Sequence, residues 1–288
     1  MSPPAIDPAV ESVFRARDLI ARDFHRFIEQ VLRDERGRPM RQGALHRAMR
    51  LHVEHCWRKG VFPAVLGPVE HGKTGNLVVG LIAHELGLDP SLRVKVICAN
   101  DRQAMKRVMG VTSILRSPVY RMLFPRTRFA SQAERRRGKK TKETQHEIYL
   151  AREGHAIDPS VEATGVLMAG TGGRADLLVF DDVVEQRNAL DLPELREKVI
   201  KNVDNVWMHR LRAGGRVLLT GQPWHREDLI HDLERRPAWS VLRASISDDL
   251  RRIDLEVTNP PDDYPIPERP AEREELEALG RGARLRAS

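Results

Sequence analysis

The spacing of apolar residues along the chain changes near residue 60. Before that point, apolar residues recur at helical spacing in two stretches, 10–33 and 45–59, separated by the polar turn 34–39. After it come short apolar runs bounded by polar residues, a pattern typical of buried strands, at 62–66, 94–99, 177–180, 217–220 and 241–244. Segments of helical period lie between most of these runs, at 73–86, 101–115, 192–211 (with Asp191 as N-cap) and 227–235. Strands that alternate with helices predict an α/β fold, with a mostly parallel sheet covered by helices on both faces.

The same pattern suggests a division of the chain. Residues 1–60 form a short helical N-terminal segment, and residues 61–247 form the α/β core. Residues 116–170 interrupt the core as an excursion, with a hairpin from the strand-like pieces 146–151 and 164–168. Residues 248–288 are acidic and proline-rich, which predicts a linker with at most one short strand at 253–257, followed by a short helix at 271–279.

The net charge of +7 over 288 residues is concentrated in one segment. Between residues 126 and 142 there are eight basic side chains and one acid, so the rest of the chain sums to zero. The basic side chains are Arg126, Arg128, Arg135, Arg136, Arg137, Lys139, Lys140 and Lys142. One positive patch on a neutral body favours contact with the phosphate backbone of double-stranded DNA, with a solvated loop as the alternative.

Two features of the sequence predict where in the cell the protein is located. No apolar run approaches the roughly 18 to 20 residues that a membrane span needs, and the first residues do not form a signal sequence. We therefore expect a cytoplasmic protein with no membrane partner. Cys56 and Cys98 lie in apolar surroundings, and they are expected to be buried core residues rather than part of a disulfide or zinc site.

Residues 67–74 match the pattern G-x-x-x-x-G-K-T between a predicted strand and a predicted helix, the context of a phosphate-binding loop. In such a loop, backbone N–H groups surround phosphate oxygens, the lysine reaches the β- and γ-phosphates, and the final hydroxyl ligates Mg²⁺. The residues expected to bind ATP are Gly67, Pro68, Val69, Glu70, His71, Gly72, Lys73 and Thr74. Ahead of the first strand, Gln42 and His46 are candidates for contacts to adenine, with helix capping as the alternative.

Carboxylates follow the apolar run 177–180. Asp181 is the expected second ligand of Mg²⁺, and Asp182 is the expected base that orients the attacking water. The wider class of ATPases with this arrangement usually has Glu at the second position, so Glu185 is an alternative base. At the end of the run 217–220, Thr220 and Gln222 are candidates for sensing the γ-phosphate and coupling its loss to motion.

Several segments in order resemble the ATPase half of phage terminase large subunits, the motors that pump DNA into a viral capsid. The phosphate loop is similar to that family's Pro-Pro-Arg-His-Gly-Lys-Ser, and the Ser-Pro-x-Tyr and Phe-Pro segments are similar to residues 117–120 and 124–125. The family's Gly-rich approach to the carboxylates resembles 171–176, its Trp-His segment resembles 220–229, and its Leu-Trp-Pro-Glu-Arg resembles 265–269. The resemblance runs from about residue 45 to about residue 279.

This resemblance implies a P-loop NTPase of the additional-strand (ASCE) type that uses ATP and Mg²⁺ to translocate double-stranded DNA. It implies a virus-encoded protein in the host cell cytoplasm, whose partners are the portal protein and a small terminase subunit. It also implies a homo-oligomeric ring in which an arginine finger acts on the neighbouring subunit, for which Arg174 is the best match, with Arg210 and Arg212 as fallbacks. Glu70 departs from the family, which often has an arginine there.

Two other functions fit the sequence less fully. The first is a packaging regulator or assembly platform that binds nucleotide and DNA but hydrolyses little, suggested by Glu70 and Asp182. The second is another P-loop ATPase, such as a helicase loader, which would share the loop but not the segments around Tyr120 and Trp224. The residues after 247 are too few for the nuclease that terminase large subunits carry, so nuclease activity is expected on a separate chain or domain.

Overall fold

The computed structural model describes residues 8–34, 36–68, 71–129, 144–152, 157–168, 172–246 and 253–265. These residues form an eight-stranded sheet in the order β3-β4-β2-β5-β6-β1-β7-β8. The strands from β4 to β7 in this order run parallel, while β3 and β8 pair antiparallel at the two edges. The strands are β1 (Phe62–Leu66), β2 (Val94–Cys98), β3 (Glu147–Ile148), β4 (Val161–Gly165), β5 (Ala175–Asp181), β6 (Leu211–Gly221), β7 (Trp239–Ile246) and β8 (Ile253–Thr258). The predicted mostly parallel α/β fold is therefore confirmed.

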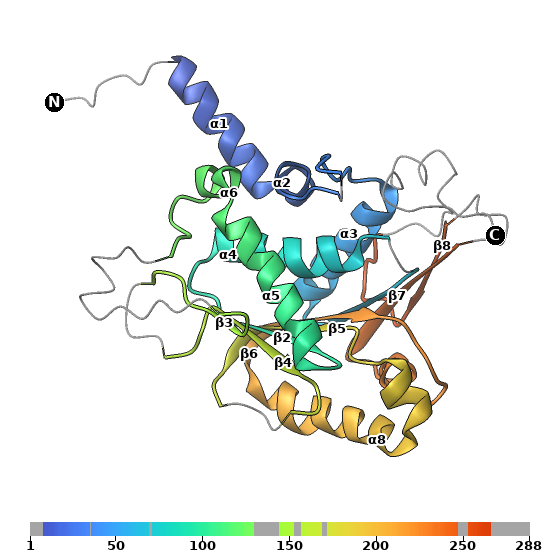
Figure 1. Cartoon of the computed structure of the whole chain (residues 1–288). Coiled ribbons are helices and arrows are strands. Elements are labelled where there is room, and N and C mark those ends of the chain that lie inside the picture. The colour runs from blue at the N-terminus through green and yellow to red at the C-terminus, as the bar shows by residue number, and fades with distance from the viewer. Residues whose placement is uncertain are drawn as a thin grey trace.

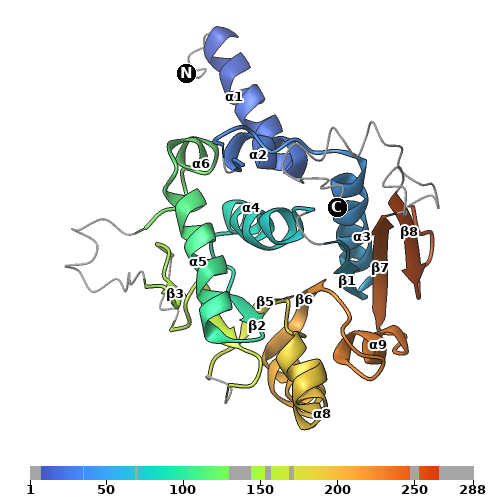
Figure 2. The ribbon, with the colours of Figure 1, turned by 45° about the vertical axis from the view of Figure 1, so that its right-hand side comes forward.

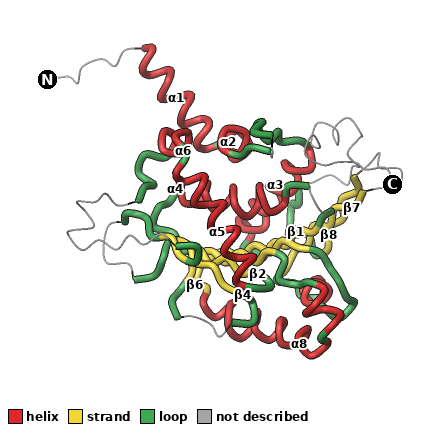
Figure 3. The backbone as a smooth tube through the Cα atoms, viewed as in Figure 1, coloured by secondary structure: helices red, strands yellow, loops and turns green. Residues whose placement is uncertain are grey.

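Helices cover both faces of the sheet, as Figures 1 and 3 show. One face carries α1 (Pro8–Arg22), α2 (Phe24–Val31), α3 (Ala44–Lys59), α4 (Leu81–Leu88), α5 (Asp101–Arg116) and α6 (Pro118–Leu123). The other carries α8 (Pro193–Asn202) and α9 (Leu229–Glu234). Wider π-helical turns occur at η1 (Thr74–Gly80), η2 (Arg187–Asp191) and η3 (Val203–Trp207), and a 3-10 turn occurs at η4 (Met208–Arg210).

Two separate hydrophobic cores follow from this layering. All five residues of β2 are buried, because this central strand has helices on both sides. Each fully buried Val or Ile contributes roughly 1.5 to 3 kcal/mol relative to an exposed one. Cys56 and Cys98 are both fully buried in the structure, as predicted. Within the described residues, no helix is long and apolar enough to cross a membrane.

Several predicted boundaries are wrong for local reasons. The stretch 10–33 is two helices, because Asp23 caps α2 by accepting from the backbone N–H groups of His25 and Arg26. The stretch 192–211 is α8 followed by π and 3-10 turns, and residue 211 already belongs to β6. Asp191 is not the N-cap of α8, because Leu192 occupies that position and no side chain caps it.

The divisions of the chain are also corrected. The second strand-like piece of the excursion is 161–165 rather than 164–168, and as β4 it pairs with β2 inside the sheet. The sheet extends past residue 247, since β8 pairs with β7. Beyond β8, the Tyr264 hydroxyl lies 2.6 Å from Nδ1 of His52 on α3. Both α2 and α3 contribute residues to the core that covers the sheet. The predicted helix 271–279 lies outside the described residues.

Candidate functional site

The carboxyl ends of β1, β6 and β5 meet at one edge of the sheet, and they bring polar side chains together there. Thr220, at the end of β6, is paired with Asp181 at the end of β5. Its hydroxyl donates to Oδ1 of Asp181 at 2.6 Å, and the Thr74 hydroxyl lies 3.4 Å from the same oxygen. The structure thus brings together Thr74, Asp181 and Thr220, three residues that the sequence analysis placed in one site. β6 lies between β1 and β5 in the sheet.

The segment that matches G-x-x-x-x-G-K-T connects β1 to η1. Lys73 is 9% exposed, and its Nζ donates to the carbonyl oxygens of Gly67 and, at 2.9 Å, Pro68. Burial lowers the pKa of Lys73, although the nearby carboxylates of Asp182 and Asp181 oppose this shift. Val69 and Glu70 lie outside the described residues.

Gly72 in this segment has a left-handed backbone with φ 71°. A Cβ atom at this position would lie 2.7 Å from Nδ2 of Asn76 and 3.1 Å from Nε2 of His46. A side chain here would therefore be strained by the backbone and by crowding. Gln222 also contacts this segment, because its Nε2 donates to the carbonyl oxygen of Gly67 at 3.1 Å. The residues at and just after the end of β6 thus contact Asp181, through Thr220, and the loop, through Gln222.

Asp181 and Asp182 differ sharply although they are adjacent. Asp181 is 1% exposed and lies in regular strand, whereas Asp182 has a left-handed backbone with φ 49°. The backbone of Asp182 is held on both sides, since its N–H donates to the Thr220 carbonyl at 2.9 Å and its carbonyl accepts from Ala99 N at 3.2 Å. Burial, followed by the charge of Asp181, raises the pKa of Asp182 above its usual range.

Sequence reasoning missed the contribution of α5. Its Arg107 donates from Nε to Oδ2 of Asp181 at 2.6 Å, and its Nη2 lies 3.5 Å from Oδ2 of Asp182. One turn earlier, Nε2 of Gln103 donates to Oε2 of Glu185 at 3.2 Å. The ion pair with Asp181 raises the pKa of Arg107, although burial alone would lower it. The one available signal was that α5 follows β2 and so begins at the same edge of the sheet.

Gln42 and His46 are buried, with 6% and 5% exposure, and Gln42 contacts η1, the helix that follows the loop. Nε2 of Gln42 donates to Oδ1 of Asn76 at 2.7 Å, and its Oε1 lies 3.0 Å from Nδ1 of His25. Nδ1 of His46 accepts from Gly43 N at 3.3 Å, a capping contact at the start of α3. Burial lowers the pKa of His46 to about 4, so the ring is neutral at pH 7. In this arrangement both side chains hold α3 and η1 in place.

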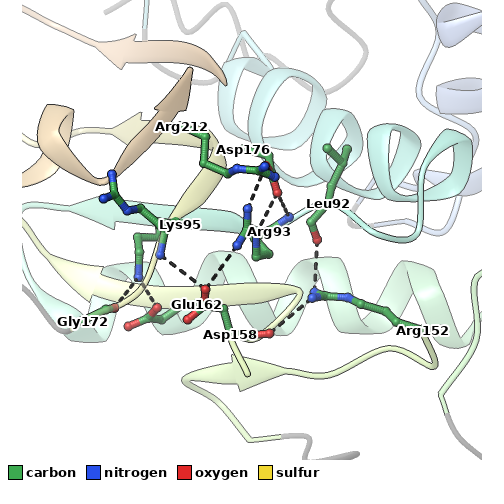
Figure 4. A network of polar contacts seen from close by, with 10 residues as sticks. Leu92, Arg93, Lys95, Arg152, Asp158, Glu162, Gly172, Asp176 and Arg212 are labelled. Carbon is green, nitrogen blue, oxygen red and sulfur yellow. Dashed lines mark hydrogen bonds and ion pairs between the residues drawn. The ribbon is translucent and has the colours of Figure 1, made fainter. Parts of the chain in front are cut away.

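The arginines considered as fingers lie at the opposite edge of the sheet. Arg174 directly precedes β5 and is exposed, and Arg210 directly precedes β6. Seven residues of β5 span roughly 20 Å at about 3.3 Å per residue, so neither side chain reaches Asp181 of its own subunit. Figure 4 shows that this edge holds an ionic network in which Arg212 and Arg93 both contact Asp176, at 3.1 and 2.9 Å. Arg212 therefore has a partner within its own chain.

Most of the basic run falls outside the described residues. Arg126 and Arg128 are exposed on the loop after α6. The remaining members are not described: Arg135, Arg136, Arg137, Lys139, Lys140 and Lys142. Among the residues that the structure does describe, no group of three or more His, Cys, Asp or Glu side chains forms a metal site.

Two of the family-like segments have clear structural roles. Ser117 caps α6 by accepting from Tyr120 N at 3.1 Å, and the buried Tyr120 hydroxyl donates to the Ala83 carbonyl at 2.8 Å. Asp228, 1% exposed, caps α9 and accepts from Trp224 N at 2.7 Å. These residues position the helices around the sheet and do not enter the site itself.

No family model matches the sequence, and no curated protein matches it. Among solved structures, the chain is similar to the large terminase of bacteriophage HK97, with 15% identity and a TM-score of 0.48. That match covers 73% of this chain and 40% of the terminase, so this chain spans less than half of that protein's length. An S-adenosylmethionine-dependent methyltransferase from Clostridium acetobutylicum also matches, with 12% identity, a TM-score of 0.28, and coverage of 81% of this chain and 78% of the other. Both TM-scores lie below 0.5, and neither likeness bears on what this chain does.

Proposed function

We propose that this chain is a P-loop ATPase of the additional-strand type and the DNA-translocating motor domain of a terminase large subunit. The observation that carries the ATPase assignment is the meeting of Lys73, Thr74, Asp181 and Thr220 at one edge of the sheet. In an additional-strand ATPase, a strand is inserted between the loop strand and the carboxylate strand, and β6 occupies that position here. The assignment to a packaging motor rests on the family-like segments of the sequence and on the basic run.

The groups in the site fit a nucleoside triphosphate with Mg²⁺. Lys73 supplies a buried ammonium whose partners are two backbone carbonyls, so a phosphate oxygen would be a stronger acceptor for it. Thr74 and Asp181 supply a hydroxyl and a carboxylate whose oxygens lie 3.4 Å apart. Both are oxygen ligands of the kind that Mg²⁺ prefers. When bound, Mg²⁺ supplies electrostatic stabilisation of the charge that develops on the phosphoryl group.

Each side chain then has a distinct task in hydrolysis. Lys73 would bind and orient the β- and γ-phosphates, and Thr74 and Asp181 would hold the metal. Asp182 would accept the proton of the attacking water, a task favoured by a carboxylate whose pKa is raised toward neutrality. Glu185, held by Gln103, is the alternative proton acceptor. Thr220 and Gln222 would transmit the loss of the terminal phosphate, because Thr220 contacts Asp181 and Gln222 contacts the loop.

A phosphate-release assay tests the ATPase proposal. Purified protein should hydrolyse ATP in the presence of Mg²⁺, and Lys73→Ala and Asp181→Asn should each abolish turnover. Lys201→Ala is the matched control, because Lys201 is exposed on α8, on the other face of the sheet from α5. Asp182→Asn should leave nucleotide binding largely intact while stopping hydrolysis. Normal turnover by Asp182→Asn together with loss in Glu185→Gln would assign the base to Glu185 instead.

The motor proposal adds partners to this chemistry. Double-stranded DNA would contact the basic run, and a ring of subunits on the portal protein, assisted by a small terminase subunit, would carry Arg174 or Arg210 to the neighbouring site. Such an arginine must come from another subunit, because both lie at the far edge of their own sheet. Addition of duplex DNA should then stimulate ATP turnover. Cleavage of DNA would require a nuclease domain or a separate chain.

One observation favours the second candidate, a nucleotide- and DNA-binding packaging regulator with little hydrolysis. Arg107 contacts both carboxylates of the site, and a guanidinium on Asp181 competes with a metal ion for the same oxygens. Tight nucleotide binding without phosphate release, with or without duplex DNA, would support the regulator and contradict the motor.

A further inference from the structure

One side of the site is formed by α5, which also packs against η1. Gln103 and Arg107 are four residues apart, so they lie on the same face of this helix. The first contacts Glu185 and the second contacts Asp181 and Asp182. Oε1 of Gln103 is buried and has no hydrogen-bond partner among the residues that the structure describes. α5 thus brings a guanidinium to Asp181 and Asp182 and an amide donor to Glu185, the alternative base.

Both oxygens of Asp181 are engaged in this arrangement. Oδ1 accepts from Thr220 and faces Thr74, while Oδ2 accepts from Arg107. Asp181 is 1% exposed, so its charge is compensated mainly by the guanidinium. A divalent cation that ligates Asp181 would place two cations, the metal ion and the guanidinium, around one carboxylate. Repulsion between the metal ion and the guanidinium would weaken the contact of the guanidinium with Oδ2, and it would favour movement of the guanidinium to another anion.

We propose that Arg107 exchanges between two anionic partners within one subunit. Before nucleotide binds, it neutralises Asp181 and Asp182, and when a Mg²⁺-bound triphosphate binds, it turns to the terminal phosphate. This inference rests on the proposed ATPase function. No covalent bond changes in the exchange; an ion pair is replaced by another.

The chemistry of the side chain suits this exchange. The planar guanidinium presents paired N–H donors that match both a carboxylate and a phosphate. Its side chain is 20% exposed, so it is not fully enclosed by the protein. Arg107 would therefore sense the terminal phosphate, because a diphosphate lacks that group and offers the displaced guanidinium no second anion.

Nucleotide binding measured by calorimetry tests the exchange without any turnover. Affinities for a non-hydrolysable ATP analogue and for ADP, each with Mg²⁺, are compared in the wild type, Arg107→Ala, Arg107→Lys and Arg102→Ala. Arg102 is the matched control, because it is exposed on the same helix. Arg107→Ala should lose about tenfold or more in affinity for the triphosphate, while ADP affinity stays within about threefold. Binding of Mn²⁺ alone should become tighter in Arg107→Ala, since Asp181 is then free of its competing cation.

The outcomes separate this inference from the proposed function. Equal losses for both nucleotides, or no loss for either, would show that Arg107 is only a counter-ion and would overturn the exchange. Arg107→Lys keeps the charge next to Asp181, so it should unfold near the wild-type temperature and still lose part of the triphosphate preference; an undiminished preference would also overturn the exchange. A wild-type chain that binds neither nucleotide would overturn the ATPase proposal itself.

Discussion

Replacing Thr220 with Val tests the buried hydrogen bond that joins β6 to β5. Valine keeps the shape of the side chain and removes only the hydroxyl that donates to Oδ1 of Asp181 at 2.6 Å. Both residues are 1% exposed, so water cannot replace the lost donor. A hydrogen bond to a charged group contributes about 1.5 to 3 kcal/mol. The free energy of unfolding should fall by about that amount, which lowers the melting temperature by about 3 to 12 °C at roughly 2 to 4 °C per kcal/mol.

Urea unfolding followed by circular dichroism measures this loss, and Thr220→Ser separates the hydroxyl from the methyl group. Serine keeps the donor and loses one buried methyl, which costs only about 1 kcal/mol. In a double-mutant cycle with Asp181→Asn, the coupling between the two positions should exceed about 0.5 kcal/mol. A Thr220→Val protein as stable as the wild type, or a coupling energy of zero, would refute the role assigned to this contact.

Other predictions address the core, the pH dependence and the DNA contact. Glu85→Gln should lower the free energy of unfolding in urea by about 3 to 5 kcal/mol, because Arg50 and Arg216, at 3.3 and 2.7 Å from opposite oxygens of Glu85, would lose their buried counter-charge. Glu197→Gln on the exposed face of α8 should cost less than about 1 kcal/mol, and an equally small effect at Glu85 would contradict this reasoning. Burial lowers the pKa of His52 and of His84 to about 4, so the unfolded chain binds protons that the folded chain does not. Their contribution to stability is complete above pH 6.5 and is lost as the pH falls toward 4, by up to about 3 kcal/mol each, and thermal unfolding at pH 7, 5.5 and 4.5 should show this fall; a flat profile would exclude it. Duplex DNA binding should weaken with salt at a slope of about −4 in log–log form if four or five basic side chains of residues 126–142 meet phosphates, and an unchanged slope after Gln replacement of that run would make it a solvated loop.

The elements predicted most accurately from the sequence are those with an uninterrupted run of apolar residues. β1 was predicted with the observed bounds, because a fully apolar run between a helix and a glycine has few other interpretations. The polar residues that follow strands β1, β5 and β6 were expected at one edge, since parallel strands end at the same side of a sheet.

Strands with mixed composition were placed less well. β4, the second strand from one edge, contains Glu162, which pairs with Lys95 of β2, so it lacks a continuous apolar run. The first half of β6 is exposed and contains Gly214 with φ 74°, and it carries no strand signal. β8, Ile253–Thr258, agrees closely with the short strand expected at 253–257, but its pairing with β7 was not expected, because the acidic composition around it favoured a linker.

The contribution of Arg107 could not be predicted from the sequence. Its partner Asp181 lies 74 residues away, and no local pattern connects the two. Only the packing of α5 over β4 and β2 brings the guanidinium to the carboxylate. Contacts of this kind depend on how a helix is rotated about its axis, which one arginine in an amphipathic sequence does not specify.

The left-handed backbone at Asp182 limits which amino acids this position accepts. Aspartate and asparagine tolerate a positive φ better than residues with longer or branched side chains, and neighbours on both sides fix the conformation here. Glutamate has a longer side chain, so Asp182→Glu would cost backbone strain in addition to any gain in reach. The choice of acid at this site is thus constrained by main-chain geometry as well as by chemistry: Asp, Asn and Gly suit the backbone, and of these only Asp supplies a carboxylate.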